Sequence, residues 1–194
     1  MTSFIHFSCT SHLLIVLHKD SSWSLWSISL VFILNSGWYC ICCTVWGRLL
    51  DTRLSSTSVG LYGTIILTCG FFLLGPAPFI PLDVNIYLIV IGTLLFSTGN
   101  AANVVATFSG TTQAAISSGA SDNIATYGLV GGCWKTCVCM SFFLGFSVGD
   151  ILLDVFGYEW ASMSVITIES VGIVATSLHL YVTRKKLRTG YIQI

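Results

Sequence analysis

Two ionisable side chains, Lys135 and Glu169, stand inside long apolar stretches of the sequence. A charged group in the middle of a membrane-depth helix costs about 2.5 to 3.5 kcal/mol on insertion scales. Lys135 lies eleven residues after Ile124, and Glu169 lies eleven residues after Tyr158, where the next stretch begins. Two antiparallel helices of this kind would bring the ammonium and the carboxylate to one depth. We hypothesise either a structural ion pair or a site for a substrate or a proton.

A polar stripe marks the apolar stretch before Lys135. Asn100, Asn103 and Thr107 follow spacings of three and four residues, which places them on one face of a helix. Such a face either forms hydrogen bonds with neighbouring helices or lines a cavity for a polar solute. Trp134 lies deeper in its stretch than an interfacial aromatic residue would, so we include it. The binding candidates are Lys135, Glu169, Asn100, Asn103 and Trp134.

The sequence has none of the motifs that mark soluble enzymes or zinc sites. It contains no Walker loop, HExxH, GxSxG or zinc-ligand spacing. Seven of the eight cysteines fall within apolar stretches, where we expect them to pack as small apolar side chains. We therefore expect no enzymatic activity, no metal and no cofactor.

The composition is that of a membrane protein. Of 194 residues, 54% are hydrophobic and 8% are charged, whereas about a quarter of the residues in a soluble domain are charged. The formal net charge is zero, and nucleic-acid binding has no support. A bilayer core of about 30 Å requires about 20 apolar residues in a helix. Five stretches satisfy this length: 23–45, 59–80, 84–108, 124–148 and 158–182.

These stretches predict an all-α, polytopic membrane protein with about five full transmembrane helices plus a partial sixth at 4–18. We expect residues 1–22 to hold that partial helix and a lumenal or extracellular loop, 23–183 the helical bundle, and 184–194 a basic tail. Tight turns are expected at 117–122, where Asp122 or Asn123 can cap the following helix, and at 149–157.

The distribution of basic residues predicts how the chain crosses the bilayer. Because successive loops lie on opposite sides of the bilayer, one group of basic residues falls on one side and Lys19 falls on the other. Cytoplasmic loops carry the excess of lysine and arginine. The carboxy terminus is therefore expected in the cytoplasm, and the sequence suits vesicle and plasma membranes alike. The group consists of Arg48, Arg53, Arg184, Lys185, Lys186 and Arg188.

The fourth stretch is rich in glycine, which predicts close approach of a neighbouring helix. Gly145 and Gly149, four residues apart, form the expected helix-packing motif, whether for rigid packing or for sliding. Gly128, Gly131 and Gly132 belong to the same stretch.

The predicted loop after the first stretch has the pattern Gly47-x-Leu49-x-Asp51, with Arg53 just beyond it. This pattern resembles the motif that joins paired helices in the major facilitator superfamily of transporters. Further matches are the segments 74–78, 145–150 and 156–161. From Gly47 onward the chain resembles the carboxy-terminal half of such a transporter, most like the vesicular amine and polyamine branch of solute carrier family 18 type.

The resemblance implies half of a major facilitator fold, with the five stretches as helices eight to twelve and 4–18 as the end of helix seven. It implies transport of small organic, cationic amine-like solutes by proton-coupled alternating access. The expected partners are the bilayer, a small-molecule solute, and an amino-terminal half or a second copy. Phe146 and Asp150 replace the proline and the glycine usual in the family. The alternative is a non-transporting membrane protein that dimerises with or regulates a full-length relative.

Overall fold

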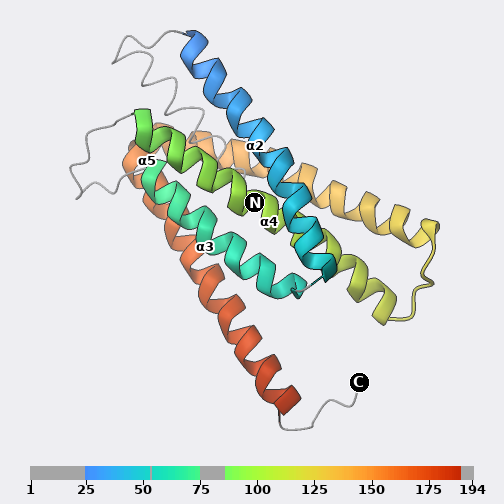
Figure 1. Ribbon diagram of the computed structural model, residues 1–194. Coiled ribbons are helices and arrows are strands. Elements are labelled where there is room, and N and C mark those ends of the chain that lie inside the picture. The colour runs from blue at the N-terminus through green and yellow to red at the C-terminus, as the bar shows by residue number, and fades with distance from the viewer. Residues whose placement is uncertain (1–24, 53, 75–85, 189–194) are drawn as a thin grey trace.

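The computed structural model describes residues 25–52, 54–74 and 86–188 (Figure 1). Its helices are α2 (Leu25–Thr52), α3 (Ser56–Leu74), α4 (Ile86–Ser117) and α5 (Ile124–Arg188). Helix α5 bends at Gly157 into two arms, and the described residues contain no strand. The all-α prediction is confirmed.

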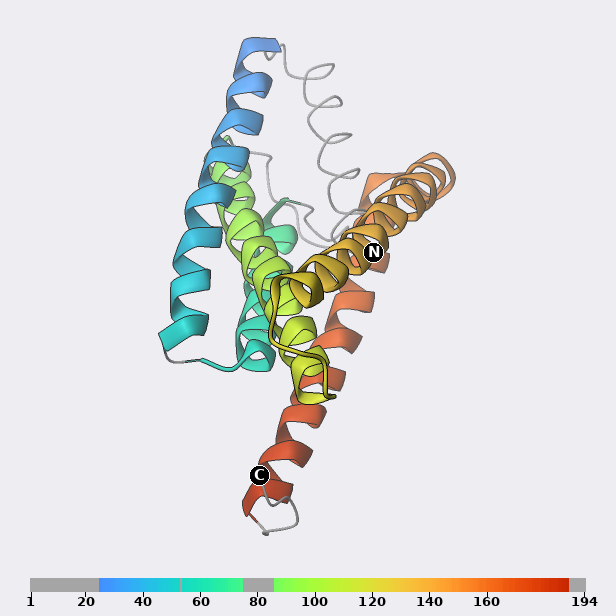
Figure 2. The ribbon, with the colours of Figure 1, turned by 90° about the vertical axis from the view of Figure 1, so that its right-hand side faces the viewer.

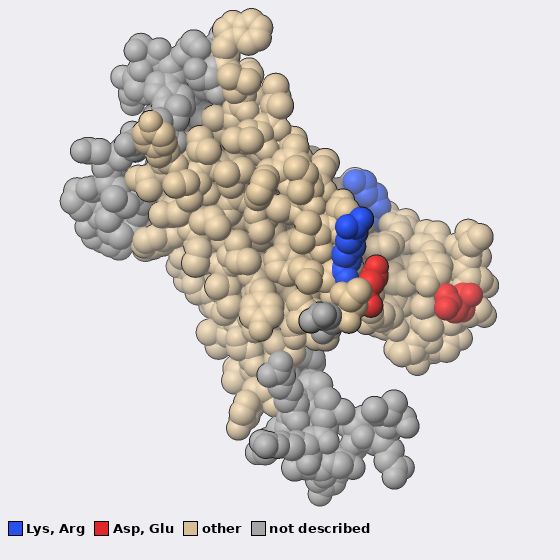
Figure 3. All heavy atoms as spheres, viewed as in Figure 1, with Lys and Arg blue, Asp and Glu red and all other residues tan. Residues whose placement is uncertain are grey.

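Within the described residues, four helical segments are long and apolar enough to cross a membrane: Ser29–Thr52, Ser56–Leu74, Tyr87–Ser117 and Ile124–Gly157. The second arm of α5 adds a shorter apolar helix at Ile166–Val182. Large apolar side chains also cover much of the outer surface, as expected for contact with lipid. The described face in Figure 3 carries few charged side chains. The chain is a polytopic membrane protein; the predicted helix 4–18 lies outside the described residues.

Helices α3 and α4 form an antiparallel pair with the most extensive contact in the structure. Helix α2 packs on α4, and the second arm of α5 runs beside α3 (Figure 1). The first arm of α5 meets α4 and then diverges from α2, as Figure 2 shows.

Glycines bring α3 and α4 together. Gly63 and Gly70 of α3, seven residues apart, face Gly99 and Gly92 of α4, which have the same spacing. A Cβ added to Gly70 would lie 2.5 Å from the backbone nitrogen of Phe96, closer than real Cβ atoms come. Only glycine permits this separation of the two backbones.

The glycines predicted for close packing in the fourth stretch behave differently. A Cβ added to Gly128 or Gly132 would have no neighbour within 4 Å, so no helix approaches there among the described residues. Gly145 and Gly149 are buried. Their role as a packing motif stays a prediction.

The charged motif after the first stretch is helical, so the prediction of a loop over 47–53 is wrong for most of its length. Helix α2 continues to Thr52. The reason is packing: Trp46 and Leu50 contact the buried cluster of Val59, Ala102 and Ala106, and the continued helix keeps their backbone hydrogen-bonded.

The connection after Thr52 is short. The backbone nitrogen of Leu54 donates to the carbonyl of Leu49 at 3.2 Å. Ser55 Oγ accepts from the backbone nitrogen of Ser58 at 3.3 Å and so caps the start of α3.

Two other helices are longer than predicted. Helix α4 extends to Ser117, beyond the expected end at 108, and the first arm of α5 continues through 149–156 as helix. The turn expected at 149–157 is reduced to Gly157, with φ 76° and ψ 172°. The turn at 117–122 forms as predicted, and Asn123 Oδ1 caps α5 by accepting from the backbone nitrogen of Thr126 at 2.9 Å.

Candidate functional site

A cavity of about 430 Å³ lies between α2, α4 and the first arm of α5. Each of the three helices contributes both polar and apolar or aromatic side chains to its wall. The lining residues are Asn35, Ser36, Tyr39 and Cys40 of α2, Phe96, Ser97, Asn100 and Val104 of α4, and Trp134, Lys135, Val138 and Phe142 of α5.

The polar lining lies far from the helix ends. Asn35, Asn100 and Lys135 lie 10, 14 and 11 residues from the nearer ends of their helices, at Leu25, Ile86 and Ile124. At 1.5 Å per residue these separations are about 15 to 21 Å. Half of a bilayer core is about 15 Å. The cavity therefore lies at the middle depth of the membrane-spanning bundle.

Hydrogen bonds between α2 and α4 hold one wall of the cavity. Ser97 Oγ donates to Asn35 Oδ1. Trp38 Nε1 donates to Thr98 Oγ1 at 2.9 Å, and Trp46 Nε1 donates to the carbonyl of Thr98 at 3.1 Å. Such bonds between membrane helices are worth about 0.6 kcal/mol each. Together they set the rotation of α2 against α4 and so point Asn35 toward the cavity.

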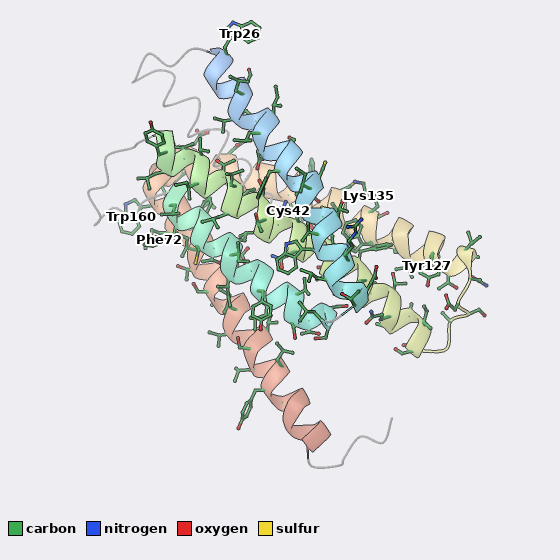
Figure 4. All side chains as sticks on the ribbon, viewed as in Figure 1. Trp26, Cys42, Phe72, Tyr127, Lys135 and Trp160 are labelled. Carbon is green, nitrogen blue, oxygen red and sulfur yellow. The ribbon has the colours of Figure 1, made fainter. Side chains whose placement is uncertain are left out.

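The opposite wall is positioned by an aromatic contact. The rings of Trp134 on α5 and Phe108 on α4 meet edge to face, with centroids 5.7 Å apart and an interplanar angle of 74°. Lys135 follows Trp134 and is exposed (Figure 4). The contact thus places Trp134 and the adjacent Lys135 at the edge of the cavity.

Lys135 is the one charged side chain among the described residues of the lining. Around it stand carboxamide and hydroxyl groups, which exchange hydrogen bonds, and aromatic rings, which pack against apolar groups. This combination suits reversible binding of a small organic molecule.

Three of the five predicted binding residues line this cavity: Lys135, Asn100 and Trp134. Asn103 does not, because its Oδ1 accepts from Thr64 Oγ1 of α3 at 3.2 Å. Asn103 instead lines a separate groove of about 550 Å³ formed by α3, α4 and the second arm of α5. The predicted polar stripe is therefore divided between a cavity and a helix contact.

Glu169 is buried in the second arm of α5 and is absent from the described lining of the cavity. Lys135 precedes the bend at Gly157 by 22 residues, and Glu169 follows it by 12. Along the helix axes these separations are about 33 and 18 Å. Because the first arm is longer than predicted, the structure does not place the two groups at one depth.

Helix α2 contributes residues to the cavity lining, but none of them was among the predicted binding residues. Asn35 is the single carboxamide residue in the stretch 23–45, and Tyr39 follows it on the same helix face. A lone carboxamide in an apolar stretch is the feature of the sequence that could have identified Asn35 as a candidate.

The residues of the transporter-like motif lie at the end of α2. Asp51 is exposed, Leu49 is half-buried, and a Cβ on Gly47 would meet nothing within 4 Å. Arg53 lies outside the described residues. Their role as a family motif stays a prediction.

Comparison with known proteins identifies similar transporters. The chain is 28% identical over 145 residues to the rat MFS-type transporter SLC18B1, covering 74% of this chain and 32% of the relative. The mouse and human proteins of the same name are 28% and 26% identical over 136 residues, covering 70% of this chain and 30% of each relative. The resemblance to major facilitator transporters is confirmed.

The chain spans about a third of the length of these major facilitator relatives. No protein-family model matches it, and no solved structure shows significant similarity. All three relatives carry the name of a transporter.

Proposed function

We propose that this chain forms the carboxy-terminal half of a solute transporter and that its cavity is this half's share of the solute pathway. The observation that carries the proposal is the cavity at middle depth, where Asn35, Asn100 and Lys135 meet from three helices. Major facilitator transporters place their solute between two halves at the midplane. The position of the cavity agrees with that arrangement.

Alternating access requires a second half. The side chain of Lys135 is exposed, so the cavity is open on the side of α5. A separate amino-terminal half or a second copy of this chain would close that side and rock against it.

The resemblance also implies an amine-like cation exchanged for protons. A cation binds most strongly beside a carboxylate, and the described lining of the cavity contains none. In this proposal the partner half would supply it. Glu169, buried in an apolar arm, is the candidate for the proton site. A stable Glu169→Gln variant whose transport still follows a pH gradient would remove Glu169 from that role.

The test is uptake by the purified chain in proteoliposomes, measured with radiolabelled phenethylamine and phenylacetate, with and without a pH gradient. We expect saturable uptake of phenethylamine, the amine-like cation, and its loss in Asn100→Leu, which replaces a carboxamide of the cavity lining with an apolar side chain. Asn103→Leu, outside the cavity, is the matched control. Absence of saturable uptake at every protein-to-lipid ratio, including ratios that permit dimers, would contradict transport by two copies of this chain.

The groove beside Asn103 supports a second candidate function, regulation of a full-length relative. Small residues line it, among them Gly60, Ala106 and Gly110, and such residues allow another helix to approach closely. The discriminating experiment measures transport by a full-length relative with and without this chain. Regulation predicts a change with the parent chain and none with Gly60→Leu, which blocks the groove.

A further inference from the structure

Lys135 shares its cavity with side chains that suit a cation. Aromatic faces attract an ammonium group, and Tyr39 of α2 and Trp134 of α5 line the wall. Asn35 and Asn100 add carboxamide oxygens, which accept hydrogen bonds from N–H donors. The amine-like cation of the proposed function therefore meets one unfavourable neighbour in the described lining, the ammonium group of Lys135.

Two cations in this cavity would repel each other. Its volume of about 430 Å³ keeps a ligand close to Lys135, and the part of the wall that the structure describes has no carboxylate to offset both charges. At an effective dielectric constant of about 20, two unit charges about 4 Å apart weaken each other's binding about a thousandfold. A carboxylate from the partner half would neutralise one cation and leave the other. Binding of the amine therefore favours loss of the charge on Lys135.

Lysine, unlike arginine, can lose its charge. A low-dielectric site and a nearby cation both favour the neutral amine of lysine over its ammonium form. The other titratable groups that face Lys135 are Tyr39 and Cys40 of α2, and α4 and the rest of α5 add no charged or titratable side chain to the described lining. Neither a phenol nor a thiol carries a positive charge. Lys135 is therefore the group in this lining that can lose a positive charge by releasing a proton.

We propose that an amine cation and the proton on Lys135 occupy this cavity alternately. As the amine binds, an N–H bond of the Lys135 ammonium breaks, its electron pair stays on the nitrogen, and the proton passes to water. The neutral Lys135 amine then accepts a hydrogen bond from the ligand, and the charge of the cavity is unchanged. The inference rests on the proposed function, because it adds a coupling residue, distinct from Glu169, to the same cavity.

This exchange has the sign that transport driven by a pH gradient requires. On the less acidic side of the membrane Lys135 releases its proton more readily, so the amine binds there. On the acidic side a proton returns to Lys135, and the amine leaves. Alternating access would therefore carry the amine toward the acidic side while a proton moves the other way.

The test measures how ligand binding depends on pH. The ligand is trimethyl(phenethyl)ammonium, whose charge is the same at every pH, and its binding to the full chain in lipid nanodiscs is measured by titration calorimetry. We expect its Kd to fall about tenfold for each unit rise in pH across neutrality, because the proton on Lys135 is then easier to displace. Calorimetry in buffers of different ionisation enthalpy should detect a proton released for each ligand bound.

Three variants test the role of Lys135. Lys135→Met should bind the ligand at least tenfold more tightly than the parent chain at neutral pH, with no pH dependence and no proton release. Lys135→Arg stays charged and should bind the ligand weakly at every pH. Arg48→Met is the matched control, because it removes an exposed positive charge outside the cavity and should keep the pH dependence of the parent chain.

Cys40 reports whether the ligand lies in this cavity. Its thiol is exposed in the lining, whereas Cys69 is exposed on α3 away from the cavity. Bound ligand should slow the modification of Cys40 by a neutral methanethiosulfonate and leave the modification of Cys69 unchanged. Peptide mass spectrometry measures both rates.

The outcomes separate this inference from the proposed function. Protection of Cys40 without proton release keeps the cavity as a solute site and overturns the exchange at Lys135. A pH dependence that persists in Lys135→Met and disappears in Glu169→Gln also overturns it, since the exchanged proton then belongs to Glu169. Failure of both the parent chain and Lys135→Met to bind the ligand overturns the cavity as a solute site and the inference with it.

Discussion

Gly63 of α3 and Gly99 of α4 face each other so closely that a Cβ added to Gly99 would lie 2.5 Å from the carbonyl oxygen of Gly63. The reverse distance, from a Cβ on Gly63 to the carbonyl oxygen of Gly99, would be 3.0 Å. Both residues are buried. This contact sets the separation of the helix pair on which α2 and α5 pack.

Replacing Gly99 by alanine should therefore destabilise the bundle. The added methyl group must push α3 and α4 apart, because its nearest neighbours are backbone atoms that cannot rotate away. We expect a loss of about 1 to 3 kcal/mol in the free energy of unfolding, typical of overpacking. Reversible unfolding of the purified chain in mixed micelles measures it.

Gly132→Ala is the matched control for Gly99→Ala, since a Cβ at Gly132 has open space within 4 Å. Alanine favours helix over glycine by up to about 1 kcal/mol, so this variant should be neutral or more stable. Equal losses in both variants would show that the α3–α4 contact is not the cause.

The hydrogen bond from Thr64 Oγ1 to Asn103 Oδ1 should contribute a small, measurable stability. Thr64→Val keeps the shape and removes the donor, so we expect a loss of about 0.6 kcal/mol, with about 1.7 kcal/mol as the upper end. Thr136→Val is the control, because the Thr136 hydroxyl donates within its own helix, to the carbonyl of Gly132. A double-mutant cycle with Asn103→Ala measures the coupling, and additive effects would mean that the bond contributes nothing.

The bend in α5 should depend on Gly157. Its φ of 76° and ψ of 172° lie in a region that is essentially restricted to glycine, where a side chain costs about 1 to 3 kcal/mol. We expect Gly157→Ala to lower the thermal unfolding midpoint, while Gly172→Ala in the second arm does not, because Gly172 has open space at its Cβ. A straightened α5 with unchanged stability would be the contrary result, detectable by distance measurements between spin labels on the two arms.

The order of the helices predicts which connections share one side of the membrane. Helices α2 and α4 end on the side where α3 and α5 begin, and the bend at Gly157 lies toward the other side (Figure 1). In sealed vesicles, an impermeant maleimide should label Thr52→Cys and Ser118→Cys from one side. It should label Phe156→Cys from the opposite side. Labelling of Phe156→Cys together with Ser118→Cys would mean that the first arm of α5 does not cross.

The same experiment tests the predicted orientation. The positive-inside pattern predicts that Arg48 and the basic tail lie in the cytoplasm. Thr52→Cys should therefore be labelled only in inside-out vesicles, as should an epitope at the carboxy terminus. Labelling in right-side-out vesicles would reverse the assignment.

The sequence by itself determined that the chain is helical and crosses a membrane. Long uncharged stretches such as 59–80 can satisfy their backbone polar groups in lipid only as helices. It also determined the turn before α5, because Asn123 caps a helix through local hydrogen bonds. Lys135, Asn100 and Trp134 were recognisable as candidates because each is unusual in its apolar surroundings.

The tertiary structure decided which of these residues meet. Ser97 donates a hydrogen bond to Asn35, 62 residues away, whereas Asn103 accepts one from Thr64. Glu169 and Lys135 belong to different arms of α5. Packing also set the helix ends, since Leu50 keeps α2 helical beyond the predicted span. The hydropathy of a segment depends only on its own residues, so the sequence is enough to predict that a helix lies in lipid. The face that a helix presents to a neighbour depends on how closely two backbones can approach, which only the assembled bundle determines.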